Sequence, residues 1–280
     1  MRILITGADG QLGHELQRTL SCHDLILGIY PAFDLLKPEI ESFVTDACPD
    51  VVIHAAAYTN VEQAEQEPDV AMSVNADGTE RVARAVSKIG ARLICLSTDY
   101  VFDGQKGAPY EETDPTNPLN AYGRSKLEGE RRALAYCSNT LIIRTAWLYG
   151  LHGNNFVKTI MQRAVEQKEL RIVADQRGCP THAGDLAAAI AKVVKVDLRG
   201  IAHATGSGSC TWHEFASKII SLMGVAIAVR PITTEEARRA AIRPPYTVLA
   251  NRTLAQLGIT MPHWEDALVR FMQDMQATAR

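Results

Sequence analysis

RILITGADGQLG, residues 2–13, opens the chain with a short apolar run and a glycine-rich loop. The apolar run predicts a strand, and the residues after the loop predict a helix. In such a loop the first glycine permits a tight turn, the second lets the backbone approach a pyrophosphate, and the third lets the helix pack on the strand. Free N–H groups at the helix start then face the phosphates. The segment therefore predicts a dinucleotide site with contacts from Gly7, Gly10, Gln11, Leu12 and Gly13.

Strands and helices alternate through the first half of the chain, which is typical of a doubly wound parallel sheet. Further strands are expected at residues 25–29, 51–54, 92–96 and 141–144. Beyond Gly150 the pattern becomes mixed and no second phosphate loop follows. The sequence thus predicts an α/β protein, with a Rossmann-type doubly wound parallel sheet and a smaller mixed α/β substrate domain. We expect residues 1–150 to form the NAD(P)-binding domain, completed by parts of 171–200, and residues 151–280 mainly to bind substrate.

The end of the second strand, Gly28-Ile29-Tyr30-Pro31, bears on the choice of cofactor. A NAD site usually has an acidic residue there for the ribose hydroxyls, and an NADP site has a basic one. Neither is present, so the preference between NADH and NADPH stays open. Asp34 and Leu35 follow a few residues later, and we expect them to contact the adenine side of the cofactor.

Small residues follow the third strand at Ala55, Ala56 and Ala57, just before Tyr58. Small side chains at a strand end let a cofactor lie against the backbone, although a tightly packed turn would need the same residues. Asn75 lies on the following helix, where it is either an ordinary polar residue or a partner of the active-site backbone. Because ligands of doubly wound sheets bind at the carboxyl ends of the strands, we expect all five residues in the cofactor site.

The fourth strand ends in Ser97 and Thr98, and a helix expected to begin at Pro118 carries Tyr122 and Lys126. Four residues make about one helical turn, so the phenol and the ammonium share a face. A free tyrosine has a pKa of about 10, and a neighbouring cation lowers it by favouring the phenolate. The hydroxyl of Thr98, the tyrosine and the lysine would form a proton relay for carbonyl reduction. This spacing also arises by chance on surface helices, but here the strand ends converge on it.

Composition argues against several classes of function. The chain has 280 residues, of which 46% are hydrophobic and 22% charged, and its net charge is −3 without a long basic run, so neither nucleic acid nor membrane is expected as a partner. No apolar run approaches the roughly 18 residues that span a bilayer, and Met1 leads straight into a strand without room for a signal peptide. The six cysteines and the five histidines beyond residue 150 show no metal-ligand spacing. We therefore expect a cytoplasmic protein with reduced thiols and no metal.

The assembled motifs resemble the extended short-chain dehydrogenase/reductase family over nearly the whole chain. The glycine loop and the Tyr-x-x-x-Lys pair specify only that superfamily. A closer similarity, to its dTDP-4-dehydrorhamnose reductase branch, is carried by other runs. They are Ala55-Ala56-Ala57-Tyr58-Thr59, Ser97-Thr98-Asp99-Tyr100-Val101-Phe102, Arg144-Thr145-Ala146-Trp147, Gly153-Asn154-Asn155-Phe156, Asp175-Gln176 with Pro180-Thr181, and Arg243-Pro244.

The resemblance implies an activity and a role for each matching residue. The reaction would be NAD(P)H-dependent reduction of the 4-keto group of dTDP-4-dehydro-L-rhamnose to dTDP-L-rhamnose. Tyr122 would donate the proton, Lys126 would bond the nicotinamide ribose, and Thr98 would orient the carbonyl. Asp99 and Trp147 match positions that line the sugar.

Some members of the family dimerise through a magnesium ion held by carboxylates from separate segments. Glu15 matches one such position and Asp274 falls near another, but the third is Gly184, with Asp185 adjacent. This resemblance leaves open whether the chain forms a homodimer, and magnesium is not expected to bind. Glu15 would then be an exposed helix residue.

Two other functions stay open. A reductase of another nucleotide-linked 4-keto sugar would share every motif. A non-catalytic, NADP-binding relative, the regulatory subunit of methionine adenosyltransferase, would keep the fold. The presence of the hydroxyl, the tyrosine and the lysine favours an enzyme.

The second strand also yields a prediction about cofactor use. Because its end has no acidic residue to repel a 2′-phosphate and no basic residue to hold one, we expect NADH and NADPH to be used with catalytic efficiencies within about tenfold, or about 1.4 kcal/mol. Steady-state kinetics with each cofactor measures this ratio. A preference above roughly a hundredfold in either direction would contradict it.

Overall fold

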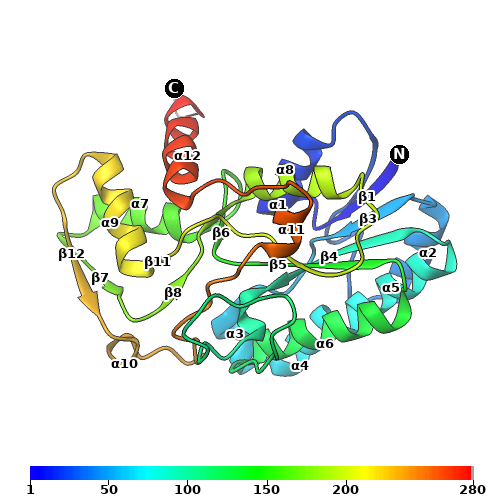
Figure 1. The fold of residues 1–280 in the computed structure, drawn as a ribbon, viewed down its shortest axis with the longest axis horizontal. Helices are drawn as coiled ribbons and strands as arrows, with labels where there is room; N and C mark the ends of the chain where they lie inside the picture. Colours follow the sequence, from blue (N-terminus) through cyan, green and yellow to red (C-terminus); the bar gives the residue numbers. More distant parts are fainter. Residues whose placement is uncertain (279–280) are drawn as a thin grey trace.

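The computed structural model describes residues 1–278, and its larger lobe is built on a six-stranded sheet (Figure 1). All strand pairs are parallel, in the order β10-β5-β4-β3-β1-β2. The order reverses at β1, which is where doubly wound sheets bind their ligands. The doubly wound parallel sheet expected from the sequence is therefore confirmed. Its strands are β1 (Arg2–Thr6), β2 (Asp24–Gly28), β3 (Val51–His54), β4 (Arg92–Thr98), β5 (Thr140–Thr145) and β10 (Gly200–His203).

Successive side chains of the strands enter two separate hydrophobic cores, one on each face of the sheet. Ile3 and Ile5 pack with helices α1 and α8, whereas Leu4 packs with α2, α5 and α6. Strands buried on both faces read as unbroken apolar runs, as the sequence of β1 does. The helices are α1 (Gln11–Thr19), α2 (Glu39–Ala47), α5 (Gly78–Lys88), α6 (Ala121–Tyr136) and α8 (Ala183–Val193).

Two helices differ from their expected form. Helix α6 begins at Ala121 rather than Pro118, because the Asn120 side chain caps it by accepting a hydrogen bond from the Gly123 amide at 2.8 Å. The helix expected to carry Asn75 is divided into α4, a π-helical turn over Ser73–Asp77, and α5. Single π-helical turns are frequent at functional sites, and this one carries Asn75. The short helices before it are α3 (Val61–Gln66) and α4 (Pro68–Met72).

The smaller lobe, on the left of Figure 1, has its own core around the buried rings of Tyr149, Phe215 and Phe271. Its three two-stranded sheets pair β7 with β12, β8 with β11, and β6 with β9. The strands are β6 (Leu148–Tyr149), β7 (Glu169–Val173), β8 (Arg177–Gly178), β9 (Thr181–His182), β11 (Cys210–Thr211) and β12 (Ala228–Ile232). The helices are α7 (Phe156–Glu166), α9 (Trp212–Met223), α10 (Thr234–Ala237) and α12 (Trp264–Thr278).

Three elements from beyond residue 150 join the larger lobe, namely α8, β10 and α11 (Arg252–Gln256), whose Leu254 is buried in the same core as α8. Helix α8 lies within the segment 171–200 from which the completion of this domain was expected, and the last strand of the sheet, Gly200–His203, begins at the final residue of that segment. We propose that residues 1–150 with α8 and β10 bind the cofactor, and that the remainder of 151–280 mainly binds substrate.

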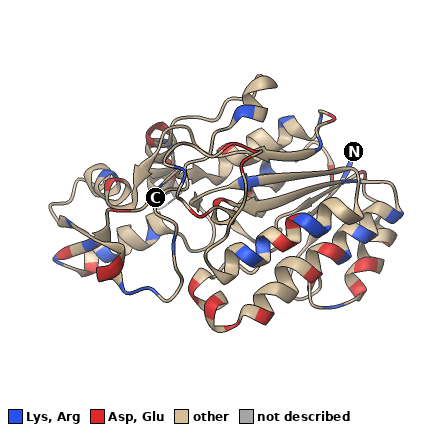
Figure 2. Cartoon of the chain, turned by 60° about the horizontal axis from the view of Figure 1, so that its bottom comes forward, with Lys and Arg blue, Asp and Glu red and all other residues tan. Residues whose placement is uncertain are grey.

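Blue and red segments are mixed along the longer helices in Figure 2, whereas the short helices α3 and α4 carry acidic residues and no Lys or Arg. Within residues 1–278, no helix is both long and apolar enough to cross a membrane.

The tight packing of α1 on β1 yields a stability prediction. A Cβ on Gly13 would lie 2.3 Å from the Gly7 carbonyl oxygen and 2.6 Å from the Ala8 backbone, so Gly13→Ala must displace the loop. We expect a loss of about 2 kcal/mol in the free energy of unfolding, measured by urea denaturation, although alanine favours helices. At Gly90, whose φ is 66°, a Cβ would meet nothing within 4 Å, so Gly90→Ala controls for backbone strain alone. A Gly13→Ala protein as stable as its parent would contradict this packing.

Candidate active site

A cavity of about 1200 Å³ lies where the carboxyl ends of β1 to β5 meet the smaller lobe. Every site residue expected from the sequence lines it except Asn75. The expected residues brought together are Gly7, Gly10, Gln11, Leu12, Gly13, Asp34, Leu35, Ala55, Ala56, Ala57, Tyr58, Thr98, Asp99, Tyr122, Lys126 and Trp147.

The glycine loop joins three strand ends on the floor of this cavity. The Gly7 amide donates to the Gly28 carbonyl at 2.9 Å, and Gly7 has a φ of 65°, which favours glycine. A Cβ at Gly7 would lie 2.8 Å from the Ala56 backbone. The loop after β1 is therefore pressed against the turn after β3, and both leave backbone groups open to a nucleotide.

Tyr122 and Lys126 lie on α6 and Thr98 ends β4, so the three expected catalytic side chains share one wall of the cavity. The Thr98 hydroxyl lies close enough to the Tyr122 phenol to lower its pKa. The Lys126 ammonium is buried and donates to the Leu96 carbonyl at 2.7 Å.

The electrostatics of the pair differ from expectation. Burial raises the pKa of Tyr122, the nearby Thr98 hydroxyl lowers it, and the charges of Asp99 and Tyr100 raise it. Burial lowers the pKa of Lys126. The expectation that Lys126 lowers the pKa of the phenol is wrong in this structure, because the ammonium is turned to the backbone of β4. A buried phenol with a raised pKa keeps its proton until a strong acceptor is placed beside it.

A buried ion pair fixes this wall from behind. Glu130, one turn after Lys126, accepts two hydrogen bonds from Arg144 at 2.9 and 2.7 Å, and a third from the Ser97 hydroxyl at 2.5 Å. Both charged side chains are 3% exposed. The carboxylate thus ties α6 to the ends of β4 and β5 and also raises the pKa of Lys126.

Asn75 acts one layer behind the cavity. Its Oδ1 accepts from the Tyr58 amide at 2.8 Å, and its Nδ2 donates to the Tyr58 carbonyl and to the Ser125 hydroxyl, both at 3.0 Å. Asn75 is therefore a hydrogen-bonding partner of the active-site backbone rather than an ordinary polar helix residue. The π-helical turn presents Asn75 to both the turn after β3 and α6.

Two indole rings form a further wall, and the sequence pointed to only one of them. Trp147 and Trp212 stack at 3.4 Å between ring centroids and 7° between planes. Trp147 adopts a φ of 46°, which is strained for a bulky side chain, and a Cβ on Gly178 would lie 2.5 Å from its ring. Trp212 begins α9, after a Thr211–Glu214 capping box. A lone tryptophan there gave no functional signal, because only tertiary packing places it beside Trp147.

Arg243 reaches the cavity from the loop after α10. It is paired with Glu62 on α3, whose carboxylate also accepts from the Ala240 amide at 3.0 Å. Hydrogen bonds from Arg243 and the nearby positive charge lower the pKa of Glu62, against the effect of burial. Lys126 and Arg243 are the two cationic residues that line the cavity within the described chain.

A second, more open pocket of about 660 Å³ lies on the smaller lobe, near α9 and the start of α12. Two ion pairs line it, Arg177 with Glu214 at 3.0 Å and Lys218 with Glu265 at 2.9 Å. These charges already neutralise each other, and the phenol, ammonium and glycine loop all lie in the larger cavity. We therefore assign the chemistry to that cavity.

Comparison with known proteins identifies the family. A family model described as "RmlD substrate binding domain" matches residues 1–277. The dTDP-4-dehydrorhamnose reductase of Sinorhizobium fredii is 40% identical over 97% of this chain and 97% of its own. The spore coat polysaccharide biosynthesis protein SpsK of Bacillus subtilis is 39% identical over 98% of this chain and 97% of its own. The chain belongs to the RmlD family.

A solved RmlD-family structure has the same fold throughout. The dTDP-4-dehydrorhamnose reductase from Bacillus anthracis, described in complex with NADP, is 41% identical and superposes with a TM-score of 0.95 over 98% of this chain and 99% of its own. The resemblance of the sequence to this reductase branch is confirmed.

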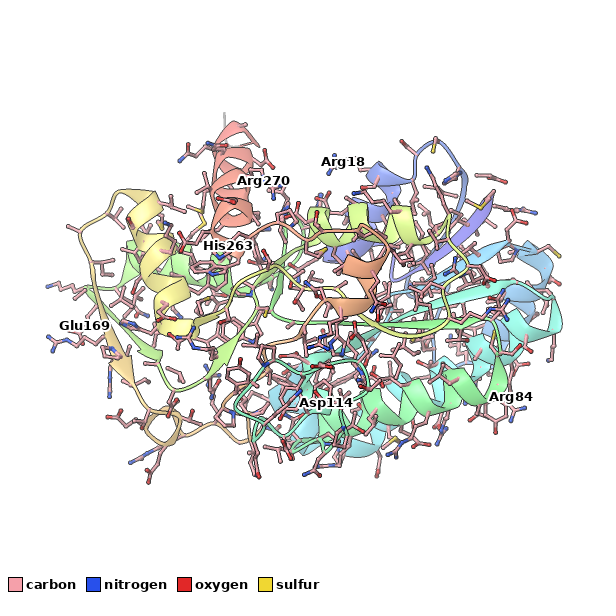
Figure 3. The ribbon with its side chains drawn as sticks, in the orientation of Figure 1. Arg18, Arg84, Asp114, Glu169, His263 and Arg270 are labelled. Atoms are coloured by element: carbon pink, nitrogen blue, oxygen red, sulfur yellow. The ribbon has the colours of Figure 1, made fainter. Side chains whose placement is uncertain are left out.

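The carboxylates considered for magnesium lie around α1, α8 and α12. Glu15 is 5% exposed and pairs with Arg18 at 2.9 Å, so the expectation of an exposed helix residue is wrong. The reason is that the start of α8 covers it, since a Cβ at Gly184 would lie 3.4 Å from its Oε2. Figure 3 shows Arg18 by α1 and Arg270 on α12, on the same side of the molecule.

Arginines already neutralise these carboxylates. Asp185 accepts a hydrogen bond from Arg270 at 2.7 Å, and the negative charge of Asp274 also raises the pKa of Arg270. Within residues 1–278, no three His, Cys, Asp or Glu side chains are grouped to hold a metal ion.

This charge balance predicts how the RmlD-family chain responds to magnesium. Because the Arg270 pair would have to break before Asp185 could bind a cation, we expect sedimentation velocity to give the same mass in excess magnesium and in EDTA. An Asp185→Asn control should behave like the parent in both. A clean shift from dimer to monomer on adding EDTA, lost in Asp185→Asn, would show that Asp185 supplies the missing ligand.

Proposed function

We propose that this protein reduces the 4-keto group of dTDP-4-dehydro-L-rhamnose with NADPH or NADH and releases dTDP-L-rhamnose. The single observation that carries the proposal is the wall of Thr98, Tyr122 and Lys126 in the same cavity as the glycine loop. Reductases of that substrate at about 40% identity over nearly the whole chain support the choice of sugar. A cytoplasmic location and a homodimer belong to the same proposal.

The nucleotide would lie across the ends of β1, β2 and β3. Gly7, Gly10 and Gly13 leave the backbone open to the pyrophosphate, and Ala55 to Ala57 form a flat wall beside it. Asp34 and Leu35 line the end of the cavity where the adenine is expected. When bound, the reduced nicotinamide supplies a hydride to C4 of the sugar.

The protein's own residues position the carbonyl and supply the proton. Tyr122 holds its proton until the developing alkoxide at O4 is strong enough to accept it. Thr98 would orient the carbonyl towards the phenol. Lys126, held against β4 by the Leu96 carbonyl, would bond the nicotinamide ribose.

The far end of the cavity suits a nucleotide sugar. The Trp147–Trp212 stack offers an apolar surface for a deoxysugar, and Asp99 can accept its hydroxyl groups. With Lys126 beside the cofactor, Arg243 is the cation left for the anionic diphosphate of the substrate.

A second candidate is a reductase of another nucleotide-linked 4-keto sugar, which the 39% identity to a spore coat polysaccharide biosynthesis protein favours. A purified-enzyme screen of dTDP-4-keto sugars, with each nicotinamide cofactor, separates the two. The third reading, a regulatory subunit of methionine adenosyltransferase, would require tight NADPH binding without turnover of any sugar.

The proton-donor role of Tyr122 is tested by Tyr122→Phe, which keeps the ring and removes only the O–H group. Cofactor binding, followed by fluorescence titration, should survive, while turnover falls by at least about 100-fold. Tyr136→Phe is the matched control, because Tyr136 ends the same helix at 38% exposure and outside the cavity. Lys126→Met should weaken cofactor binding as well as turnover. If Tyr122→Phe keeps most of its turnover on every sugar tried, the assignment is wrong.

A further inference from the structure

A strap of chain, residues 240–243, connects the smaller lobe to the larger lobe beside the cavity. It follows α10 and reaches α3, where one carboxylate, that of Glu62, receives three groups from it (Figure 1). Glu62 Oε2 accepts hydrogen bonds from the Ala240 and Ala241 amides at 3.0 and 3.4 Å, and Glu62 Oε1 accepts one from Arg243 Nη1. Both oxygens of this carboxylate are therefore bound to the strap.

Other contacts hold the backbone of the strap besides those of Glu62. The Ile242 carbonyl accepts a hydrogen bond from Asn120 Nδ2 at 2.9 Å, and the same fully buried asparagine caps α6. Just past the strap, Pro244 packs against Gly104, where a Cβ would lie 2.8 Å from the proline Cβ. The role of Glu62 that these contacts do not replace is its pairing with the guanidinium.

Arg243 benefits from such a partner because its side chain is long and lines an open cavity. An arginine loses rotamer freedom when it is held in one geometry, and the pair with Glu62 imposes that geometry before any ligand binds. A guanidinium has five N–H donors in a planar fork. While Nη1 is bound to Glu62, the donors of the other two nitrogens can bind the oxygens of a diphosphate in parallel hydrogen bonds.

Glu62 is suited to orient the guanidinium rather than to be displaced from it. Burial raises the pKa of Glu62, but the hydrogen bond and charge of Arg243 and the two strap amides lower it overall, so the carboxylate stays charged at neutral pH. The Ala240 and Ala241 amides hold its second oxygen, so it cannot follow the guanidinium towards a ligand. Arg243 lines the cavity, whereas Glu62 lies outside that lining.

We propose that Glu62 is a positioning residue that presents the Arg243 guanidinium to the diphosphate of the nucleotide-sugar substrate. The inference rests on the proposed function, in which Lys126 bonds the nicotinamide ribose and Arg243 is the cation left for that diphosphate. Glu62 touches neither substrate nor cofactor. Its contribution is to order the arginine in advance, which lowers the cost of binding the substrate.

Glu62→Gln tests this role with little change of shape. The carboxylate faces hydrogen-bond donors with both oxygens, whereas a glutamine amide has one acceptor oxygen and one NH2 group. In the variant, N–H groups must face either the strap amides or the guanidinium. The clamp between the strap and Arg243 is therefore broken on one side, whichever way the amide is turned.

Isothermal titration calorimetry of the full chain, saturated with NADPH, should show a loss specific to the diphosphate. Glu62→Gln should bind dTDP about tenfold more weakly than the parent, or by about 1.4 kcal/mol. The affinity for thymidine, which has no phosphate, should stay unchanged, as should the affinity for NADPH in a separate titration. Glu62→Asp keeps both acceptor oxygens and should bind dTDP more tightly than Glu62→Gln does.

Glu236→Gln is the matched control. Glu236 lies on α10, four residues before the strap and outside the cavity. Its carboxylate pairs with Arg171 at 3.8 Å and closes a capping box that a glutamine can also form. This variant should bind dTDP as the parent does.

A double variant tests whether Glu62 acts through Arg243. Arg243→Met removes the guanidinium and should itself weaken the binding of dTDP. Adding Glu62→Gln should weaken it no further, because the carboxylate then has no guanidinium to orient. Losses that multiply in the double variant would mean that Glu62 acts independently, and the positioning role would be wrong.

Two further results with Glu62→Gln would overturn the proposal. Equal losses of affinity for dTDP and thymidine would mean that the carboxylate only keeps the strap in place. Tighter binding of dTDP would mean that Glu62 competes with the diphosphate for Arg243.

Steady-state kinetics separates this role from the reductase function. Because the diphosphate does not react, Glu62→Gln should raise the KM for a dTDP-4-keto sugar about tenfold and leave kcat close to that of the parent. If the parent reduces the sugar and Glu62→Gln has the parental KM, the positioning role fails and the reductase function stands. If no sugar is reduced although dTDP binding depends on Glu62 and Arg243 as expected, the reductase function fails and the positioning of Arg243 for a nucleotide diphosphate is supported.

Discussion

The carboxylate of Glu130 holds the active-site wall together. It receives the Arg144 guanidinium and the Ser97 hydroxyl from two different strands, with almost no exposure to solvent. Removing one partner of such a pair typically costs about 3–5 kcal/mol, since a buried charge is left uncompensated. The pair therefore fixes where α6 lies on the sheet. Thr98 directly follows Ser97, and Lys126 lies one turn before Glu130. The Glu130 contact therefore also fixes the positions of Thr98 and Lys126.

The parts of the site that the sequence predicted have local causes. Glycines at 7, 10 and 13 are needed by the backbone wherever a strand turns tightly into a helix, and the apolar run before them must be buried on both faces. The one-turn spacing of Tyr122 and Lys126 is likewise a property of the helix itself. Such requirements can be recognised within a short stretch of sequence, which explains why the sheet and most of the cavity lining could be predicted from the sequence.

The parts that the sequence missed have long-range causes. Lys126 binds the Leu96 carbonyl because α6 lies directly on β4, and Glu15 is covered by α8, more than 160 residues away in the chain. Trp212 enters the site only because the start of α9 packs against Trp147, 65 residues earlier in the chain. The raised pKa of Asp99 comes from burial by several elements together. None of these contacts leaves a pattern of spacing in the sequence.

The indole stack across the cavity has an optical consequence. Two of the three tryptophans of the chain lie face to face at 3.4 Å, both packed against the core of the smaller lobe, while Trp264 is buried within that core. Transition dipoles at this distance couple, so the near-ultraviolet circular dichroism of the protein carries an exciton signal that depends on the angle between Trp147 and Trp212. The chain thereby contains its own spectroscopic probe of how the segment after β5 is packed against α9, with Trp264 as an internal reference.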